Sequence, residues 1–455
     1  GACPHRGVQW GCMKRHGIVT FGRDGINYDK SASDERIKSY WVDAGTEGRE
    51  QRPSGDLRRI CGPLAGHVPA LCNPTVEAAM PAVGEAMDGV YVDCTFGRGG
   101  HSAALLARLS EKGRLFAFDV DPEAVEVARQ LERQDPRFQI LHRPFGDLAE
   151  AVPPDVELSG VLMDLGVSSP QLDEPARGFT AGRLDMRMNP GQGVPAGRAL
   201  EGLDVKELAW ILREYGEDKD PLLAARLAEA LRGWQAQHGP FENSEELRES
   251  VANVKRGLDD RSQRPEKLTF QAVRMWINQE AWQFQRVLEG AFERLKYGGR
   301  CAVIVFKRSE TMMLLRFVSA HEEPDPEMVE GWPRRRLFQL YPLLGSSRAW
   351  CLRQVGEPIA PTEQEILYNH RSRSARTYVL EKRRRRVRWS LPAGGVAQEI
   401  FRKPAAAPAF GGREVAPEPP EPPCDMGPEE AFCEYFGPHR GWRPQLPADA
   451  PAPAG

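Results

Sequence analysis

The chain has 455 residues and a mass of 50.8 kDa, enough for two or three domains with a sizeable core. Its 61 Lys and Arg against 64 Asp and Glu give a formal charge of -3, which excludes a globally basic nucleic-acid coat but not a local basic patch. Mean hydropathy is -0.50 and no apolar run approaches the ~20 residues that cross a bilayer, so we expect a soluble protein with no membrane partner. Nine scattered cysteines without a CxxC pair predict a reducing compartment, no disulfide framework and no metal site.

The two ends of the chain differ in composition from its middle. Residues 1–63 mix charges of both signs with Gly and show no sustained period, so we expect an N-terminal extension that is partly disordered or a targeting segment. Its acidic residues are atypical of an organelle transit peptide. Residues 391–455 hold 14 of the 38 prolines and are predicted to be a disordered tail, because such a stretch buries too little apolar surface to offset chain entropy.

Residues 64–172 show a regular alternation of helix and strand patterns. Strands alternating with helices of about ten residues predict an α/β domain with a parallel, doubly wound sheet, whose ligands bind at the carboxyl ends of the strands. The predicted helices are 74–86, 101–109 and 122–133, and the predicted strands are 89–96, 114–120, 139–145 and 160–166.

An all-helical block at 173–268 interrupts this alternation, which then resumes over 269–390. Apolar residues at i, i+3 and i+4 spacing predict helices in the block, and Asn243 followed three residues later by Glu246 has the spacing of a capping box. Such an insert usually caps or shapes the substrate side of a site. Predicted are helices 205–216, 221–235 and 244–255 in the block, then a long helix 269–295 and a strand within 296–306.

The loop after the first strand, Asp93 to His101, is the first candidate site. Glycines let the backbone approach a ligand closely, and the helix that follows favours negative charge at its start. A dinucleotide fingerprint needs a third glycine where this chain has Ser102, so binding of NAD is disfavoured. An acidic residue followed by F-G-x-G-G is the loop shape of S-adenosylmethionine enzymes. The alternative is an ordinary tight turn.

Two further carboxylates follow predicted strands. Asp119 stands where a ribose-binding carboxylate is expected, whereas Asp121 is better placed to cap the helix that starts at Pro122. Asp164 follows a buried strand, where a charge is costly unless it is used. It is the candidate catalytic residue, orienting a substrate amine or the cofactor's ammonium group. The alternative is a carboxylate that caps the loop to Ser168 and Ser169.

Five segments together resemble one family, the small-subunit ribosomal RNA cytosine-N4 methyltransferases of bacteria and organelles. They occur in order over about residues 64–386. They are DCTFGRGGHS (93–102), MDLGVSSPQLD (163–173), RGF...LDMRMNP (177–190), TFQAVRMWIN (269–278) and NHRSRSARTYVLEK (369–382). The resemblance implies a class I S-adenosylmethionine-dependent methyltransferase with a Rossmann-like sheet and an inserted helical subdomain. It also implies S-adenosylmethionine as donor and a cytidine of the decoding centre (P site) as acceptor.

The resemblance also implies the ligand positions. Cofactor contacts carry over to Gly99, Gly100, His101, Asp119, Phe145, Asp164 and Gln171. Phe145 offers an apolar face to adenine, with core packing as the alternative. The family continues its fifth strand as F-H-S-L-E-D-R, whereas this chain reads Phe306 to Met312 as FKRSETM, keeping only Phe306 and Glu310. A second hypothesis is therefore an RNA-binding or ribosome-assembly factor that keeps the fold with weakened catalysis.

Contact with RNA is expected through arginines, which suit phosphates and stacked bases. The basic residues Arg371, Arg373 and Arg376 lie in a family motif and are the main candidates; the run 382–386 with Arg388 and Trp389 is a second place, and 334–336 a weaker one. The expected partner is small-subunit ribosomal RNA or the small subunit, with a homodimer as a further expectation. The expected location is a chloroplast or mitochondrion in a eukaryote, with the cytoplasm as the alternative.

Overall fold

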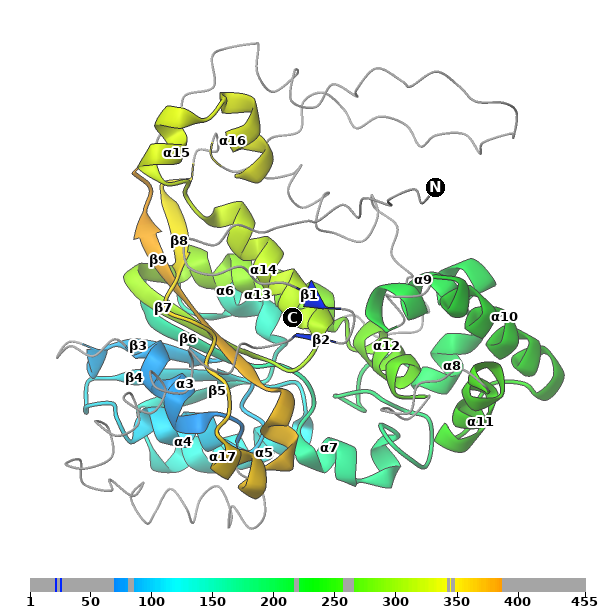
Figure 1. Cartoon of the computed structure of the whole chain (residues 1–455). Helices are drawn as coiled ribbons and strands as arrows, with labels where there is room; N and C mark the ends of the chain where they lie inside the picture. Colours follow the sequence, from blue (N-terminus) through cyan, green and yellow to red (C-terminus); the bar gives the residue numbers. More distant parts are fainter. Residues whose placement is uncertain are drawn as a thin grey trace, which may run out of the picture. The chain divides into compact units, whose positions relative to one another are not determined.

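The computed structural model describes residues 21–22, 25–26, 69–80, 86–216, 221–256, 266–341, 344 and 348–386 (Figure 1). The chain forms two compact units, Gly1–Ser54 and Gly55–Gly455. In the first, the described residues form an antiparallel pair of short strands, β1 (Phe21–Gly22) and β2 (Gly25–Ile26). All other described elements belong to the second unit. The tail predicted at 391–455 lies outside the described residues.

Seven strands form one sheet in the order β5-β4-β3-β6-β7-β9-β8. Strands β3 to β7 pair in parallel, and β9 is antiparallel to both β7 and β8. The five strands predicted from the sequence, β3 to β7, are parallel as expected, and β8 and β9 extend the sheet beyond them. The chain leaves β8 and enters β9 at the same end of these two strands, so β9 runs antiparallel to β8. The strands are β3 (Val90–Asp93), β4 (Arg114–Phe118), β5 (Phe138–Leu141), β6 (Leu158–Asp164), β7 (Leu295–Val305), β8 (Trp350–Gln354) and β9 (Arg376–Arg384).

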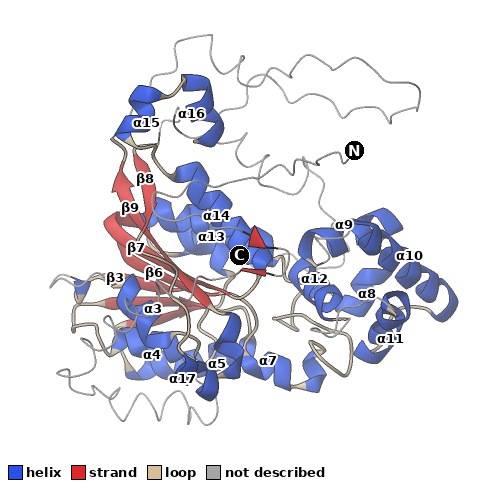
Figure 2. Cartoon of the chain, viewed as in Figure 1, coloured by secondary structure: helices blue, strands red, loops and turns tan. Residues whose placement is uncertain are grey.

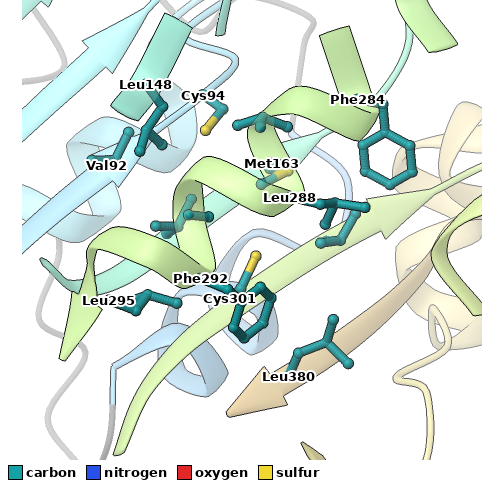
Figure 3. Close-up of a cluster of buried hydrophobic side chains, with 14 of the residues drawn as sticks. Val92, Cys94, Leu148, Met163, Phe284, Leu288, Phe292, Leu295, Cys301 and Leu380 are labelled. Atoms are coloured by element: carbon teal, nitrogen blue, oxygen red, sulfur yellow. The ribbon is translucent and has the colours of Figure 1, made fainter. Parts of the chain in front are cut away.

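Helices cover both faces of this sheet (Figure 1). Successive strand residues point to opposite faces, so Tyr91 packs into one apolar core and its neighbour Val92 into the other. The first core holds side chains of α3 (Cys72–Ala79), α4 (Gly100–Leu106) and α5 (Pro122–Gln134). The second core, shown in Figure 3, holds side chains of α13 (Glu280–Arg294) and α14 (Arg308–His321).

Two predicted helices differ from those in the structure. The predicted helix 74–86 ends at Ala79 as α3, because Pro81 disfavours helical backbone at the residue before it. The predicted helix 269–295 is two helices, α12 (Lys267–Ile277) and α13. Gln279 separates them in a left-handed conformation with φ of 50°.

The helical insert has its own apolar core. It contains α8 (Ala196–Glu201), α9 (Val205–Tyr215), α10 (Pro221–His238) and α11 (Ser244–Lys255), which Figure 2 shows as helices. Asn243 caps α11 by accepting a hydrogen bond from the backbone N–H of Glu246 at 3.0 Å, as its spacing predicts. Side chains of α12 up to Ile277 belong to the same core, past the boundary expected at residue 268.

Shorter helices complete the described part. They are η2 (Phe145–Asp147), α6 (Leu148–Ala151), α7 (Ser169–Asp173), η3 (Pro175–Arg177), α15 (Pro326–Gly331), α16 (Arg334–Leu340), α17 (Glu363–Tyr368) and η5 (His370–Ser374). None of the helices within the described ranges is long and apolar enough to cross a membrane.

Candidate active site

The candidate site lies where the strand order reverses, at the carboxyl ends of the neighbouring strands β3 and β6. Open parallel sheets bind ligands at such a switch point. The loops after these strands carry Gly97, with φ of 54°, and Gly166, with φ of 124°. A Cβ atom built on either glycine meets no atom within 4 Å. Both loops therefore border open space at the mouth of the sheet.

The loop after β3 is held by the buried carboxylate of Asp93. Its Oδ1 accepts from the backbone N–H of Thr95 at 3.0 Å and its Oδ2 accepts from the Ser102 hydroxyl at 2.7 Å. Ser102, which breaks the dinucleotide fingerprint, is thus a fixed part of the loop. Gly99 precedes α4 with φ of 78°, and a Cβ on Gly100 would lie 2.4 Å from Pro69 Cγ. Both positions require glycine for steric reasons.

Asp119 extends from the end of β4 toward the same loop. Its Oδ2 accepts from the backbone N–H of Gly97 at 2.7 Å, and its Oδ1 accepts from that of Asp121 at 2.9 Å. Burial raises the pKa of Asp119 to about 6, against these hydrogen bonds, which lower it. The carboxylate is therefore fixed beside the open side of Gly97. Its contact with a ribose stays a prediction.

Asp164, at the end of β6, has an unsatisfied oxygen. Its Oδ1 is buried without a hydrogen-bond partner, although the side chain as a whole is 25% exposed. Burial, together with the negative charges of Asp93 and Glu310, raises its pKa to about 8. A nearby cation or N–H donor would satisfy such an oxygen. The backbone N–H of Ser168, one of the groups that Asp164 could cap, donates instead to Gln171 Oε1 at 2.9 Å.

His101 lies between the loop and Asp164. Its Nε2 is 3.1 Å from the carbonyl oxygen of Ala70, and its Nδ1 is 3.8 Å from Asp164 Oδ2. Burial lowers the pKa of His101, opposed by the charge of Asp93, so the imidazole is neutral near pH 7. A neutral ring that donates to Ala70 through Nε2 presents the Nδ1 lone pair to Asp164. This arrangement suits a protonated carboxyl at Asp164 in the protein alone.

Gln171 and Phe145 are placed differently from the other predicted ligand residues. Gln171 is buried and donates through Nε2 to Asp121 Oδ2 at 2.8 Å, so it reaches the site through that carboxylate. Asp121 also caps α5, as expected, by accepting from the backbone N–H of Glu123. Phe145 starts η2 and packs, partly buried, against the core under α13. Its stacking on adenine stays a prediction.

A buried charge cluster, absent from the sequence-based site, lies beside Asp164. Arg274 donates to Glu280 through Nε at 2.6 Å and Nη2 at 2.5 Å, and Lys307 Nζ lies 3.2 Å from Glu310 Oε1. Glu310 Oε2 also accepts from the backbone N–H groups of Phe306 and Lys307. Glu310 therefore fixes the turn from β7 into α14 in the altered segment. The motif TFQAVRMWIN contains Arg274 but gives no sign of these partners.

The basic segments lie at opposite ends of β9. Arg376 pairs with Val305 at the carboxyl end of β7, whereas Arg384 pairs with Trp350 at the other end. Arg371, Arg373 and Arg376 are thus on the side of the candidate site, and Arg371 pairs with Asp173 of α7 at 2.6 Å. The run 382–386 lies at the far end, where Lys382 donates to the backbone of Glu293. Arg336 of the third cluster stacks over Trp332 at 4.4 Å.

The family follows from comparison with known proteins. The model of the MraW methylase family matches residues 65–383, about 70% of the chain. The chain belongs to this family. It is 40% identical over 302 residues to the ribosomal RNA small subunit methyltransferase H of Shewanella oneidensis, covering 65% of this chain and 92% of that protein. It is 41% identical over 301 residues to the protein of the same name from Burkholderia ambifaria, with the same coverage.

Membership confirms the resemblance inferred from the five motifs, and the sheet order with its one reversed strand confirms the α/β methyltransferase fold. A solved rRNA methylase from Streptococcus thermophilus aligns with 68% of this chain and 93% of its own at 12% identity. Its TM-score of 0.27 is too low for that likeness to bear on fold or function.

The residues present fit the cofactor of this family, S-adenosylmethionine. The open side of Gly97 and Gly166 leaves room for a ligand, and the Asp119 carboxylate suits ribose hydroxyls. Asp164 Oδ1 lacks a partner that a cationic ligand would provide. Within the described ranges, no three His, Cys, Asp or Glu side chains come together as a metal site.

Proposed function

We propose that this protein transfers a methyl group from S-adenosylmethionine to the exocyclic N4 of a cytidine in small-subunit ribosomal RNA. Membership of the methylase family supports the reaction class, and the names of its relatives support the RNA substrate. The observation that carries the proposal is the unsatisfied carboxylate oxygen of Asp164 at the switch point of the sheet. We assign the target to the decoding centre on the family resemblance.

The chemistry requires an acceptor of hydrogen bonds at the amine. The N4 lone pair of cytosine is delocalised into the ring, so a carboxylate that accepts from N4–H restores electron density to the nitrogen. When bound, S-adenosylmethionine supplies an electrophilic methyl group and a positive charge. That charge favours the ionised form of Asp164, whose pKa of about 8 otherwise keeps it protonated at neutral pH. Asp164 then holds the amine, and the proton leaves to solvent after transfer.

Access to N4 needs an exposed base. A stacked or paired cytidine has to leave the helix before the enzyme can reach its exocyclic amine. The arginines 371, 373 and 376 stand on the site's side of β9 and are proposed to bind the surrounding phosphates. A homodimer and an organellar location, with the cytoplasm as the alternative, stay predictions.

The second candidate function is an assembly factor that binds RNA without methylating it. The segment after Phe306 favours it, because only Glu310 of the following family residues is kept. Against it, Glu310 accepts both backbone N–H groups at the start of the turn, so the kept residue is the one that holds the turn's shape. Methyl transfer to small subunits by the purified protein separates the two candidates.

The test of the proposed function compares Asp164→Asn with Asp155→Asn. Asp155 is exposed near the opposite end of β6, so its variant removes the same charge away from the site. With labelled S-adenosylmethionine and small subunits, Asp164→Asn should lower kcat by about 100-fold or more, since the amide is a weaker acceptor. Cofactor affinity should fall far less than kcat, because binding in the parent protein has to ionise a carboxyl whose pKa is about 8. Unchanged turnover in Asp164→Asn, or no turnover in the parent protein, would contradict the proposal.

A further inference from the structure

One buried carboxylate oxygen connects the cofactor side of the sheet to the helical insert. Asp121 Oδ2 accepts from Gln171 Nε2 at 2.8 Å and from Arg177 Nη1 at 3.0 Å. The side chains of Arg177 and Asp121 are only 7% and 6% exposed. Arg177 lies in η3, at the entrance to the insert, whereas Asp121 follows β4. The pair therefore joins segments that are 56 residues apart in sequence.

On the cofactor side, Asp121 is one step from a predicted ligand residue. Its backbone N–H donates to Asp119 Oδ1 at 2.9 Å, while Asp119 Oδ2 holds the backbone of Gly97. The carboxylate of Asp121 also accepts a hydrogen bond from Gln171, another predicted ligand residue. A shift of Asp121 would thus disturb two predicted ligand residues, Asp119 and Gln171.

On the other side, the Arg177 guanidinium holds the loop that leads into the insert. Its Nη2 donates to the carbonyl oxygen of Met188 at 2.7 Å. The backbone N–H of Met188 in turn donates to Asn278 Oδ1 at 2.7 Å, and Asn278 Nδ2 donates to the carbonyl oxygen of Met186 at 2.8 Å. Asn278 ends α12, whose side chains belong to the core of the insert. The contacts therefore run without a break from Asp119 to the helical subdomain.

We propose that Arg177 is a positioning residue that couples the placement of the helical insert to the cofactor-binding side chains Asp119 and Gln171. The coupling rests on the proposed use of S-adenosylmethionine and extends it to a part of the chain that does not line the cofactor loops. Cofactor binding, by fixing Asp119 and Gln171, stabilises the position of the insert relative to the sheet. By reciprocity, an ordered insert raises affinity for the cofactor.

The guanidinium is suited to this task because it is planar and presents donors in two directions at once. Nη1 contacts the carboxylate while Nη2 contacts the loop, which a lysine ammonium on a flexible stem does not reproduce. Burying such a pair costs desolvation free energy that its attraction often fails to recover, so stability is a poor reason for its presence. Arg177 Nε is buried without a hydrogen-bond partner, a further cost of the arrangement.

The chain offers a matched control in the same loop. Arg187 forms a two-pronged pair with Asp185, at 2.7 and 2.8 Å, and donates to the carbonyl oxygen of Gly193, so all of these contacts stay inside the loop. Arg187→Met removes a guanidinium group from the same loop, and this group has no contact with Asp121. Arg177→Met removes the connection. Asp121→Asn is a third variant, which keeps the shape of the side chain and the oxygen that caps α5 but replaces the shared acceptor Oδ2 with an amide donor.

The experiment measures two quantities in the full chain: the Kd of S-adenosylmethionine by calorimetry, and cofactor-induced protection of α9 to α11 from amide hydrogen exchange. In the parent protein and Arg187→Met, the cofactor should slow exchange in these helices. In Arg177→Met and Asp121→Asn this protection should be lost, with Kd raised about tenfold and KM for RNA raised more than kcat falls. Circular dichroism verifies folding, and Asp121→Asn decides the question where Arg177→Met does not fold.

Three outcomes overturn the inference. Cofactor-induced protection that persists in Asp121→Asn would show that this connection carries no coupling. Equal loss in Arg187→Met and Arg177→Met would show that general loosening of the loop is responsible. If the parent protein binds no S-adenosylmethionine, the proposed function itself fails. The inference alone fails if the parent protein binds the cofactor and methylates RNA while its insert shows no protection.

Discussion

The buried carboxyl group of Asp164 lowers the stability of the folded chain at neutral pH. Its pKa is raised from 3.8 to about 8, so the folded state favours the protonated form while the unfolded chain ionises near pH 4. Stability from this group is therefore complete below pH 4 and is lost as pH rises toward 8. Asp164→Asn does not titrate. Between pH 5 and pH 8, we expect the free energy of unfolding of Asp164→Asn to rise relative to that of the parent protein by at least about 1 kcal/mol.

Urea unfolding at pH 5 and pH 8 measures this difference. Asp119, whose pKa is about 6, titrates in both proteins and cancels in the comparison. Asp155→Asn is the control, and its pH dependence should run parallel to that of the parent chain because Asp155 is exposed. Parallel curves for Asp164→Asn as well would mean that the fold does not hold this carboxyl protonated.

The positions of single site residues were predictable where they follow from the local sequence pattern of strands and helices. Asp119 and Asp164 end strands, and parallel strands end at one edge of a sheet, so their proximity to the glycine loop follows from the pattern. Partners chosen across long sequence distances were not predictable. The contact of Gln171 with Asp121 spans 50 residues, and that of Arg177 spans 56. No local periodicity contains such pairings.

At the scale of elements, the break between α12 and α13 forces one residue, Gln279, into a backbone conformation that a residue with a side chain disfavours. Gln279 is exposed and has φ of 50°, a left-handed conformation that costs a residue with a Cβ atom about 1 kcal/mol. Gln279→Gly should therefore leave the free energy of unfolding equal or raise it by up to about 1 kcal/mol. Gln279→Val should lower it by about 1 kcal/mol or more, because a β-branched residue tolerates this conformation least.

Thermal unfolding of the two variants, followed by circular dichroism, gives the sign of each effect. Asn278→Ala is the informative companion, because Asn278 holds Met186 and Met188 at this break and its loss should destabilise more than either change at Gln279. A lower Tm in Gln279→Gly than in Gln279→Val would contradict the assignment of strain to this residue.

The errors in predicted elements have the same origin. The apolar period runs on through residues 278 and 279, so the sequence pattern predicts one helix, and the break depends on contacts with a loop about 90 residues away. The direction of β9 likewise depends on the end of the sheet at which the connection from β8 brings the chain back. The residue pattern of a strand does not contain this information. The end of α3 before Pro81, by contrast, was available from the sequence alone.

At the scale of the whole second unit, the sheet separates two basic segments that are close in sequence. Arg373 belongs to η5 on the site's side, and Arg384 ends β9 at the far side, where its guanidinium lies 4.7 Å from the ring centre of Tyr297. Strand β9 puts about 25 Å between its two ends. If a cytidine binds at Asp164 as proposed, its flanking phosphates are expected on the side of the first segment and away from the second.

This separation makes Arg373→Ala and Arg384→Ala a matched pair for locating the RNA. Removing one phosphate contact should reduce the salt dependence of RNA affinity by about one unit of log-log slope. We expect this change, with weaker binding to small-subunit RNA, in Arg373→Ala. Arg384→Ala should match the parent protein in slope and affinity, and neither variant should alter the Kd of S-adenosylmethionine. Filter binding from 50 to 300 mM KCl is the measurement, and an equal loss in both variants would mean that the RNA extends along the whole length of β9.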